Sequence, residues 1–249
     1  MRSRSRQYYE KFGELFFVTS TVAGFVDIFG PNALSVHQVS AIKHSEDVQQ
    51  LLPHCLEAQS EDTVSPRTGE RLVSGGFQTE DKQPLCEILI NALNFYQRRG
   101  DFRLIGYVIM PNHFHLLIKI APGNSISKLI GNFKKYSSHQ IVRYLEENNC
   151  TDLLRILAYA AAKEPSCDCR IWKPRFDCFV LNNEETISQK LEYIHNNPVN
   201  SHLADQANGW RYSSARNYSG FEPVNLEVDV NWESLGYGKI PSGETPDGA

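Results

Sequence analysis

Two histidines stand two residues apart in the segment His113-Phe-His115, a spacing that could support metal-dependent chemistry. In an extended strand both imidazoles point to one face, with their Cα atoms about 7 Å apart at ~3.3 Å rise per residue. Neutral imidazoles are common ligands of divalent cations. A His-x-His pair on a strand can also be merely exposed or hydrogen-bonded, and the pair alone leaves this reading open. The alternation favours a functional pair, because the opposite face carries only apolar residues: Phe114, Leu116, Ile118 and Ile120.

A helix expected over residues 125–147 supplies two further polar groups. Its apolar stripe consists of Ile126, Leu129, Ile130, Phe133, Ile141 and Tyr144. At about 100° per residue, Tyr136 and Gln140 lie at the border of this stripe, one turn apart. A glutamine packed into an apolar stripe needs a hydrogen-bond partner, since its desolvation is otherwise unfavourable. We therefore predict that Gln140 is the third ligand of a cation held by the histidines, with the Tyr136 hydroxyl beside it.

Two imidazoles and one amide oxygen, without a thiolate, suit Mg²⁺ or Mn²⁺ better than a closed zinc site. Such a ligand set leaves coordination positions for water or for a phosphate. We predict that the cation polarises a scissile phosphate while Tyr136 attacks it in line, which gives a covalent phosphotyrosine. Because free tyrosine has a pKa of about 10, a nearby cation or proton acceptor must activate the hydroxyl.

Four stretches of the chain carry a family resemblance. Residues 107–118, with the letters YVIMPNHFHLLI, resemble the signature of single-tyrosine HUH transposases, where HUH denotes His-hydrophobic-His. Three more stretches resemble the REP-associated tyrosine transposase branch of this group: FKKYSSHQ at 133–140, LEYIHNNPV at 191–199 and WRYSSARNY at 210–218. The resemblance covers roughly residues 12–29 and 84–220.

The resemblance implies an α+β fold, a ferredoxin-like (RRM-like) antiparallel sheet with packed helices. The HUH histidines are then on a central strand and the nucleophilic tyrosine is on a helix. It implies a metal-dependent endonuclease and strand transferase that nicks and rejoins single-stranded DNA through a 5′-phosphotyrosine, with hairpin-bearing repeats as targets. By position, His113, His115 and Gln140 are the metal ligands and Tyr136 is the nucleophile. The alternative is a non-catalytic, domesticated protein of the same fold that binds DNA hairpins.

Four basic residues are predicted to contact DNA, because phosphate contacts dominate such interfaces. Lys134 and Lys135 precede Tyr136, while Arg175 and Arg211 lie beside aromatic residues in segments that suit single-stranded DNA. A lysine pair on a helix can equally be a solvated face, and that reading stays open.

The 249-residue chain has 25 Lys and Arg against 29 Asp and Glu, a formal charge of −4, which argues against a bulk electrostatic nucleic-acid binder. The charge is uneven, however: residues 85–180 contain thirteen basic and eight acidic residues, whereas residues 221–249 contain one and six. We therefore expect a catalytic domain over residues 1–220, with an insertion at about 30–83, followed by an acidic, irregular tail at 221–249.

The six cysteines match neither a disulfide scaffold nor a complete zinc site, which indicates reduced thiols and a cytoplasmic protein. No apolar run approaches the ~20 residues of a membrane-spanning helix, so no membrane partner is expected. The sequence leaves monomer and homodimer open. Hydrophobic periodicity predicts a strand at 15–22, helices at 84–98, 125–147, 151–163 and 184–195, and two extended segments within 103–120 that meet at Pro111-Asn112.

Overall fold

A computed structural model describes residues 15–30, 83–162, 171–222 and 224–235. The predicted insertion at 30–83 therefore lies almost entirely outside the described residues. The strands are β1 (Leu15–Thr21), β2 (Phe102–Met110), β3 (His113–Ile120) and β4 (Asp177–Leu181). The longer helices are α2 (Pro84–Arg98), α3 (Ile126–Glu147), α4 (Thr151–Ala162) and α5 (Glu184–Asn200), and the short helix α6 (Ala215–Tyr218) follows them.

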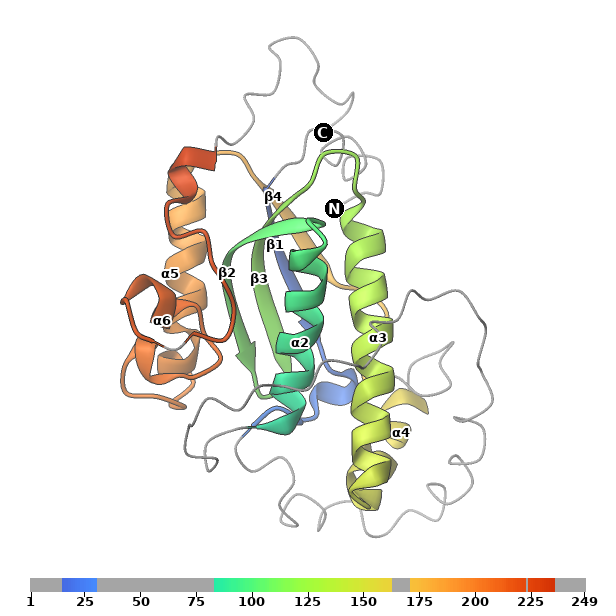
Figure 1. The fold of residues 1–249 in the computed structure, drawn as a ribbon. Coiled ribbons are helices and arrows are strands. Elements are labelled where there is room, and N and C mark those ends of the chain that lie inside the picture. Colours follow the sequence, from blue (N-terminus) through green and yellow to red (C-terminus); the bar gives the residue numbers. More distant parts are fainter. Residues whose placement is uncertain (1–14, 31–82, 163–170, 223, 236–249) are drawn as a thin grey trace.

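The four strands form one antiparallel sheet in the order β2-β3-β1-β4, so that β3 is an interior strand. Helices cover both faces of this sheet (Figure 1). On one face α2 and α3 lie side by side, and Phe133 of α3 packs edge-on against Phe114 of β3 with ring centroids 5.3 Å apart. On the other face α5 contacts β2 and β3. The chain thus has the predicted α+β architecture.

The alternation along β3 decides which residues meet which helix. Phe114 and the other apolar residues of its set are buried on the face of α2 and α3. His113, His115 and Leu117 consequently point toward the face of α5, because successive side chains of a strand point to opposite sides. A Cβ added at Gly106 would meet both Leu117 and Leu191 of α5, which places these two residues on the same face.

The helix ends follow local chemistry. The Ser125 hydroxyl caps α3 by accepting the Lys128 amide at 3.3 Å, and the Asn183 side chain caps α5 by accepting the Thr186 amide at 2.8 Å. The helix predicted over residues 184–195 is longer in the structure, because α5 continues to Asn200 with Pro198 inside it. A proline this close to the C-terminal end loses only its own N–H bond, and its carbonyl still accepts the Leu203 amide at 2.8 Å. Asn197 is therefore part of the helix.

Residues 224–235 lie along β2 and α2. Leu226 and Trp232 are buried in the core, and the Asp229 amide donates to the Leu104 carbonyl at 2.8 Å. The Asp229 carboxylate also accepts two hydrogen bonds from the Arg103 guanidinium, at 2.7 and 2.8 Å. This segment thus adds to the core of the sheet domain, while the division of the chain at residue 220 stays a prediction. Among the described helices, none has the length and apolar character needed to cross a membrane.

Candidate functional site

The two histidines of β3 lie together on the face that α5 covers. Their ring centroids are 4.8 Å apart, and the rings meet nearly edge to face. His115 is buried, whereas His113 is half-buried. Both imidazoles therefore lie on one face of an interior strand, as predicted.

His115 is held in a neutral, metal-ready state. Its Nδ1 lies 2.7 Å from the Thr19 hydroxyl of β1, and its ring stacks on Phe17 with centroids 5.3 Å apart. Burial, assisted by the neighbouring His113 and Lys190, lowers the pKa of His115 to about 3. Its Nε2 is buried without a hydrogen-bond partner. A neutral imidazole with one nitrogen engaged and the other unpartnered is the form that binds a metal.

A chain of hydrogen bonds fixes the protonation of His113. The Asn112 Nδ2 donates to Asp27 Oδ1 at 2.6 Å, because a carboxylate can only accept. The Asn112 Oδ1 therefore faces His113 and accepts its Nδ1–H at 2.7 Å, which leaves the lone pair on Nε2. Burial lowers the pKa of His113, and the Asp27 charge partly opposes this shift. Asp27 and Asn112 thus orient His113 as outer partners orient metal-ligating histidines.

Helix α5 brings a tyrosine to the histidines. The Tyr193 ring lies edge-on to His115 with centroids 5.2 Å apart, and it also contacts Phe17 at 6.1 Å. Tyr193 is 47 % exposed, so part of this residue is accessible from the surface. Lys190, one turn earlier on α5, places its ammonium 5.6 Å from the centroid of the Tyr193 ring.

Asn197 follows Tyr193 by four residues and shares its side of α5. Its side-chain Nδ2 is buried without a hydrogen-bond partner. Few described side chains have such an atom, and His115 of β3 and Asn197 of α5 are among them. Unpartnered buried polar atoms indicate a missing ligand, since their desolvation is otherwise uncompensated.

The histidine of α5, His195, holds the helix in place. His195 Nε2 lies 2.9 Å from the Ser214 hydroxyl. That hydroxyl donates to the Tyr107 carbonyl at 3.2 Å and accepts the Tyr107 amide at 2.9 Å, so the His195 ring donates to it. Burial lowers the pKa of His195 to about 4, which keeps it neutral. This contact joins the stretches 191–199 and 210–218 and sets α5 against β2.

The structure does not bring Tyr136 and Gln140 to the histidines. Both residues are on α3, which packs on the opposite face of the sheet through Phe133 and Phe114. Burial raises the pKa of Tyr96 of α2, and the nearby Tyr136 adds to this rise; burial also raises the pKa of Tyr136 itself. The sheet therefore separates Tyr136 from His115, because His115 points away from the apolar residues that α3 covers.

Comparison with known proteins identifies the family. Residues 77–197 match the family described as "Transposase IS200 like". This chain belongs to the IS200-like transposase family. The matched segment of the transposase includes both histidines of β3 and ends at Asn197 of α5.

Solved structures resemble this IS200-like transposase at low identity. A REP-associated tyrosine transposase bound to a REP hairpin has 18 % identity and a TM-score of 0.42, over 88 % of this chain and 87 % of that chain. A Deinococcus radiodurans R1 protein, described as a transposase, has 12 % identity and a TM-score of 0.36, over 73 % of this chain and 88 % of that chain. Among curated protein sequences none matches the transposase.

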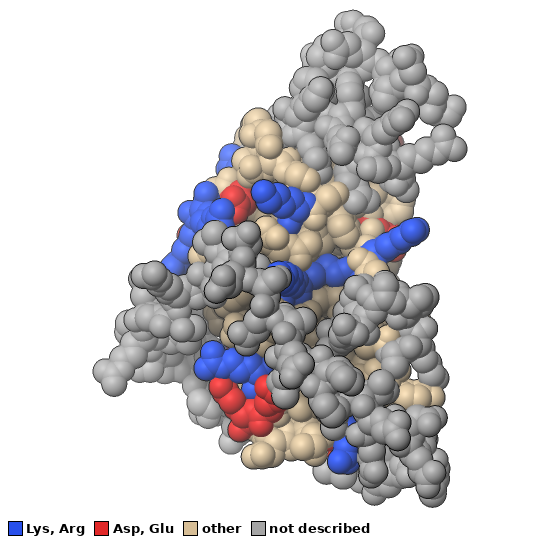
Figure 2. Space-filling view, turned by 90° about the vertical axis from the view of Figure 1, so that its right-hand side faces the viewer, with Lys and Arg blue, Asp and Glu red and all other residues tan. Residues whose placement is uncertain are grey.

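Of the four cations predicted to contact DNA, two are engaged within the transposase. The Lys134 ammonium donates to the carbonyl oxygens of Lys173, Pro174 and Arg175. Lys135 and Arg175 are exposed. On the α3 side of the molecule, Lys and Arg side chains gather near the middle of the surface (Figure 2). The DNA contacts of Lys135 and Arg175 stay predictions, whereas Lys134 serves to tie α3 to the loop before β4.

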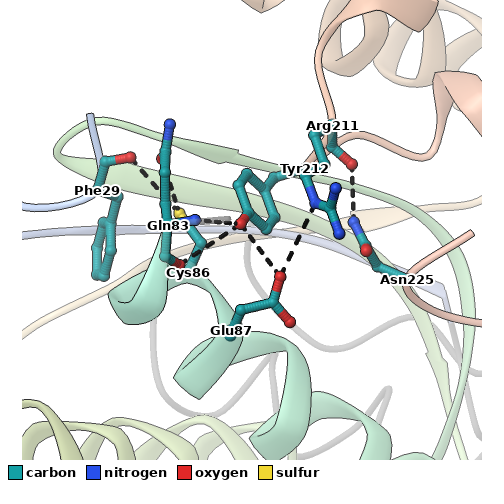
Figure 3. A network of polar contacts seen from close by, with 7 residues as sticks. All are labelled: Phe29, Gln83, Cys86, Glu87, Arg211, Tyr212 and Asn225. Carbon is teal, nitrogen blue, oxygen red and sulfur yellow. Dashed lines mark hydrogen bonds and ion pairs between the residues drawn. The ribbon is translucent and has the colours of Figure 1, made fainter. Parts of the chain in front are cut away.

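Arg211 belongs to a network at the start of α2 (Figure 3). Its Nε lies 3.9 Å from the Glu87 carboxylate. The neighbouring Tyr212 hydroxyl accepts the Gln83 amide at 2.7 Å and donates to Glu87 Oε1 at 3.1 Å. The Asn225 side chain donates to the Arg211 carbonyl at 2.8 Å. Arg211 therefore helps to fix the C-terminal segment to α2, and its contact with DNA stays a prediction.

Four residues of the site were outside the sequence-based prediction: Asp27, Asn112, Tyr193 and Asn197. Two signals in the sequence point to them. Tyr193 and Asn197 repeat the four-residue spacing of Tyr136 and Gln140, and they lie in a stretch already noted for its resemblance. The apolar alternation of β3 also shows that the helix covering Phe114 cannot reach the histidines.

Proposed function

We propose that this IS200-like transposase nicks and rejoins single-stranded DNA through a 5′-phosphotyrosine on Tyr193. The observation that carries the proposal is the approach of the half-exposed Tyr193 ring to His115, whose Nε2 is unpartnered. The elements β1, α2, β2, β3, α3 and β4 follow a β-α-β-β-α-β succession, with α4 added before β4. This succession and the strand order β2-β3-β1-β4 support a ferredoxin-like core for this site.

The residues present fit a divalent cation. His113 Nε2 has its lone pair free, His115 Nε2 is unpartnered, and the Asn197 amide is buried one turn from Tyr193. Rotation of that amide presents its oxygen in place of Nδ2, which completes a set of two imidazoles and one oxygen. We infer that these three residues, rather than a set with Gln140, hold Mg²⁺ or Mn²⁺. When bound there, the cation supplies charge stabilisation to a scissile phosphate.

The chemistry of the protein residues is a transesterification. The Tyr193 oxygen forms a bond to phosphorus while the bond from phosphorus to the 3′-oxygen breaks, and the tyrosine proton leaves to solvent as the 3′-hydroxyl takes one up. Rejoining reverses these bonds when a 3′-hydroxyl attacks the phosphotyrosine. The Lys190 ammonium, 5.6 Å from the centroid of the Tyr193 ring, favours the added negative charge of the transition state.

One chain contains every residue of the proposed site. His115 and Tyr193 meet without a second copy, so a monomer suffices for cleavage under this proposal. We propose hairpin-bearing repeats as the targets, with the strand next to the hairpin entering between Tyr193 and the histidines. An unpaired strand is required because a duplex buries the bases and stiffens the backbone.

The test is to incubate the protein with Mn²⁺ or Mg²⁺ and single-stranded DNA that flanks its gene, and to look for a denaturant-resistant adduct. The proposal predicts a protein band shifted by the mass of the cleaved DNA, which disappears on removal of the metal with EDTA. The alternative, a non-catalytic hairpin-binding protein of the same fold, predicts retention of the hairpin without any adduct. Binding without an adduct at any flanking sequence would overturn the enzymatic proposal.

A further inference from the structure

A row of aromatic rings crosses the sheet face that carries the histidines. Phe179 of β4 pairs with Phe17 of β1, so both side chains lie on one face. Phe17 in turn stacks on His115 of β3. The row therefore leads from the outer strand β4 directly to the proposed catalytic site.

The outer end of this row is open. Helix α5 contacts β2 and β3, whereas Phe179 on the opposite edge of the sheet is 52 % exposed. The Lys190 ammonium lies between the rings, 4.8 Å from the centroid of Phe17, 6.0 Å from that of Phe179 and 5.6 Å from that of Tyr193. An exposed aromatic ring beside a cation is thus fixed next to the proposed nucleophile.

We propose that Phe179 and Lys190 form a binding site for an unpaired nucleobase of the DNA strand whose phosphate Tyr193 attacks. This inference rests on the proposed function. The base stacks on the free face of the Phe179 ring, and the Lys190 ammonium pairs with the adjoining phosphate. Sheet faces that expose aromatic rings bind single strands in this way, because every base has a π-face and a duplex hides it.

Lys190 lies close to both Phe179 and Tyr193, which is why we expect the base-binding site to hold the same strand that Tyr193 attacks. Phe179 and Tyr193 both lie within about 6 Å of its ammonium, so a base on one ring and a phosphate at the other fit neighbouring nucleotides of one strand. Stacking at Phe179 would hold that strand against the sheet and direct its phosphate toward Tyr193. The site gives affinity for an unpaired base of any type, since stacking is tolerant of sequence.

The test measures binding of two fluorescein-labelled probes by anisotropy: a twelve-nucleotide oligothymidine and an abasic strand with the same phosphates. All proteins carry Tyr193→Phe, which prevents turnover. We expect Phe179→Ala to weaken oligothymidine binding about tenfold and to leave binding of the abasic strand unchanged. Phe179→Trp should retain affinity, and its indole fluorescence should be quenched by oligothymidine. Phe221→Ala is the matched control, because Phe221 is 48 % exposed and has the Arg216 guanidinium over its ring at 5.4 Å.

Equal oligothymidine affinity of Phe179→Ala and the Tyr193→Phe parent would overturn the inference, as would an equal loss for both probes. The adduct assay separates this result from failure of the proposed function. If the adduct forms but Phe179→Ala does not change the affinity for oligothymidine, the stacking site is refuted and the proposed function is not. A Phe179-dependent preference for oligothymidine without any adduct supports the stacking site and refutes the catalytic proposal.

Discussion

Tyr193 and His115 face each other across the gap between α5 and the sheet, with ring centroids 5.2 Å apart. The two residues come from elements separated by α3, α4 and β4 in the chain. They meet because α5 returns over the sheet face that α2 and α3 leave uncovered (Figure 1). Under the proposed function, the nucleophile is therefore on the last long helix of the domain.

Replacing Asn197 by alanine should weaken metal binding. The variant loses the oxygen ligand that supplements the two imidazoles, so the Mn²⁺ concentration needed for half-maximal cleavage should rise at least about tenfold. Gln140→Ala is the control, because Gln140 is on α3 and should leave the metal requirement unchanged. Titration of Mn²⁺ into the protein by calorimetry checks both variants without DNA. If the Mn²⁺ concentration needed for half-maximal cleavage rises for Gln140→Ala and not for Asn197→Ala, the proposal that Asn197 is a metal ligand is contradicted.

Asp27→Asn should reduce metal affinity about 10- to 100-fold although Asp27 is not a proposed ligand. The amide no longer forces Asn112 to present Oδ1 to His113, so the imidazole loses its fixed tautomer and orientation. The same Mn²⁺ titration measures the effect. Asp152→Asn, an exposed change on α4, should bind Mn²⁺ like the unchanged protein. Unaltered affinity in Asp27→Asn would show that the Asp27-Asn112 pair does not position His113.

Ser214→Ala should destabilise the domain and impair the site together. The buried hydroxyl joins His195 of α5 to Tyr107 of β2, and its loss leaves buried polar groups unpaired at a cost of about 1–3 kcal/mol. Urea unfolding measures the stability, and the adduct assay under conditions where the variant is folded measures the rate. Ser219→Ala, an exposed change after α6, should alter neither. A folded Ser214→Ala protein with full activity would show that this contact does not set the position of Tyr193.

Truncation should distinguish two parts of the C-terminal segment. A chain that ends at Gly220 loses the buried Leu226 and Trp232, which should lower the free energy of unfolding by at least about 3 kcal/mol. A chain that ends at Leu235 keeps these side chains and the Arg103–Asp229 ion pair, so it should be more stable than the chain that ends at Gly220 by at least that amount. Urea denaturation of the two truncated chains tests this difference. Equal stability of both would mean that residues 221–235 add nothing to the core.

Much of the fold follows from the sequence. The apolar periodicity predicts α2 and α3 within a residue or two, and the break at Pro111-Asn112 separates β2 from β3 as expected. The last long helix, predicted over residues 184–195, continues to Asn200, because Pro198 is accommodated inside its last turn. Local pattern determines such elements well, since each depends on neighbouring residues alone.

Which residues join the histidines at the site depends on how the helices pack on the sheet, and the sequence pattern alone does not determine that. The histidine pair was predictable because a strand fixes the direction of both side chains locally. Tyr136 and Tyr193 are each followed four residues later by an amide, so spacing alone cannot choose between them. The choice depends on which helix covers which face of the sheet, and on contacts such as His195–Ser214 between distant stretches.

The most direct test of the account is to identify the tyrosine that carries the DNA. The adduct formed on single-stranded DNA flanking the gene is digested with nuclease and protease, and the nucleotide-modified peptide is sequenced by mass spectrometry. Tyr193→Phe and Tyr136→Phe are assayed in parallel for adduct formation. The account predicts modification of Tyr193, loss of the adduct in Tyr193→Phe and a normal adduct in Tyr136→Phe. A nucleotide on Tyr136, or an adduct that persists in Tyr193→Phe, would contradict it.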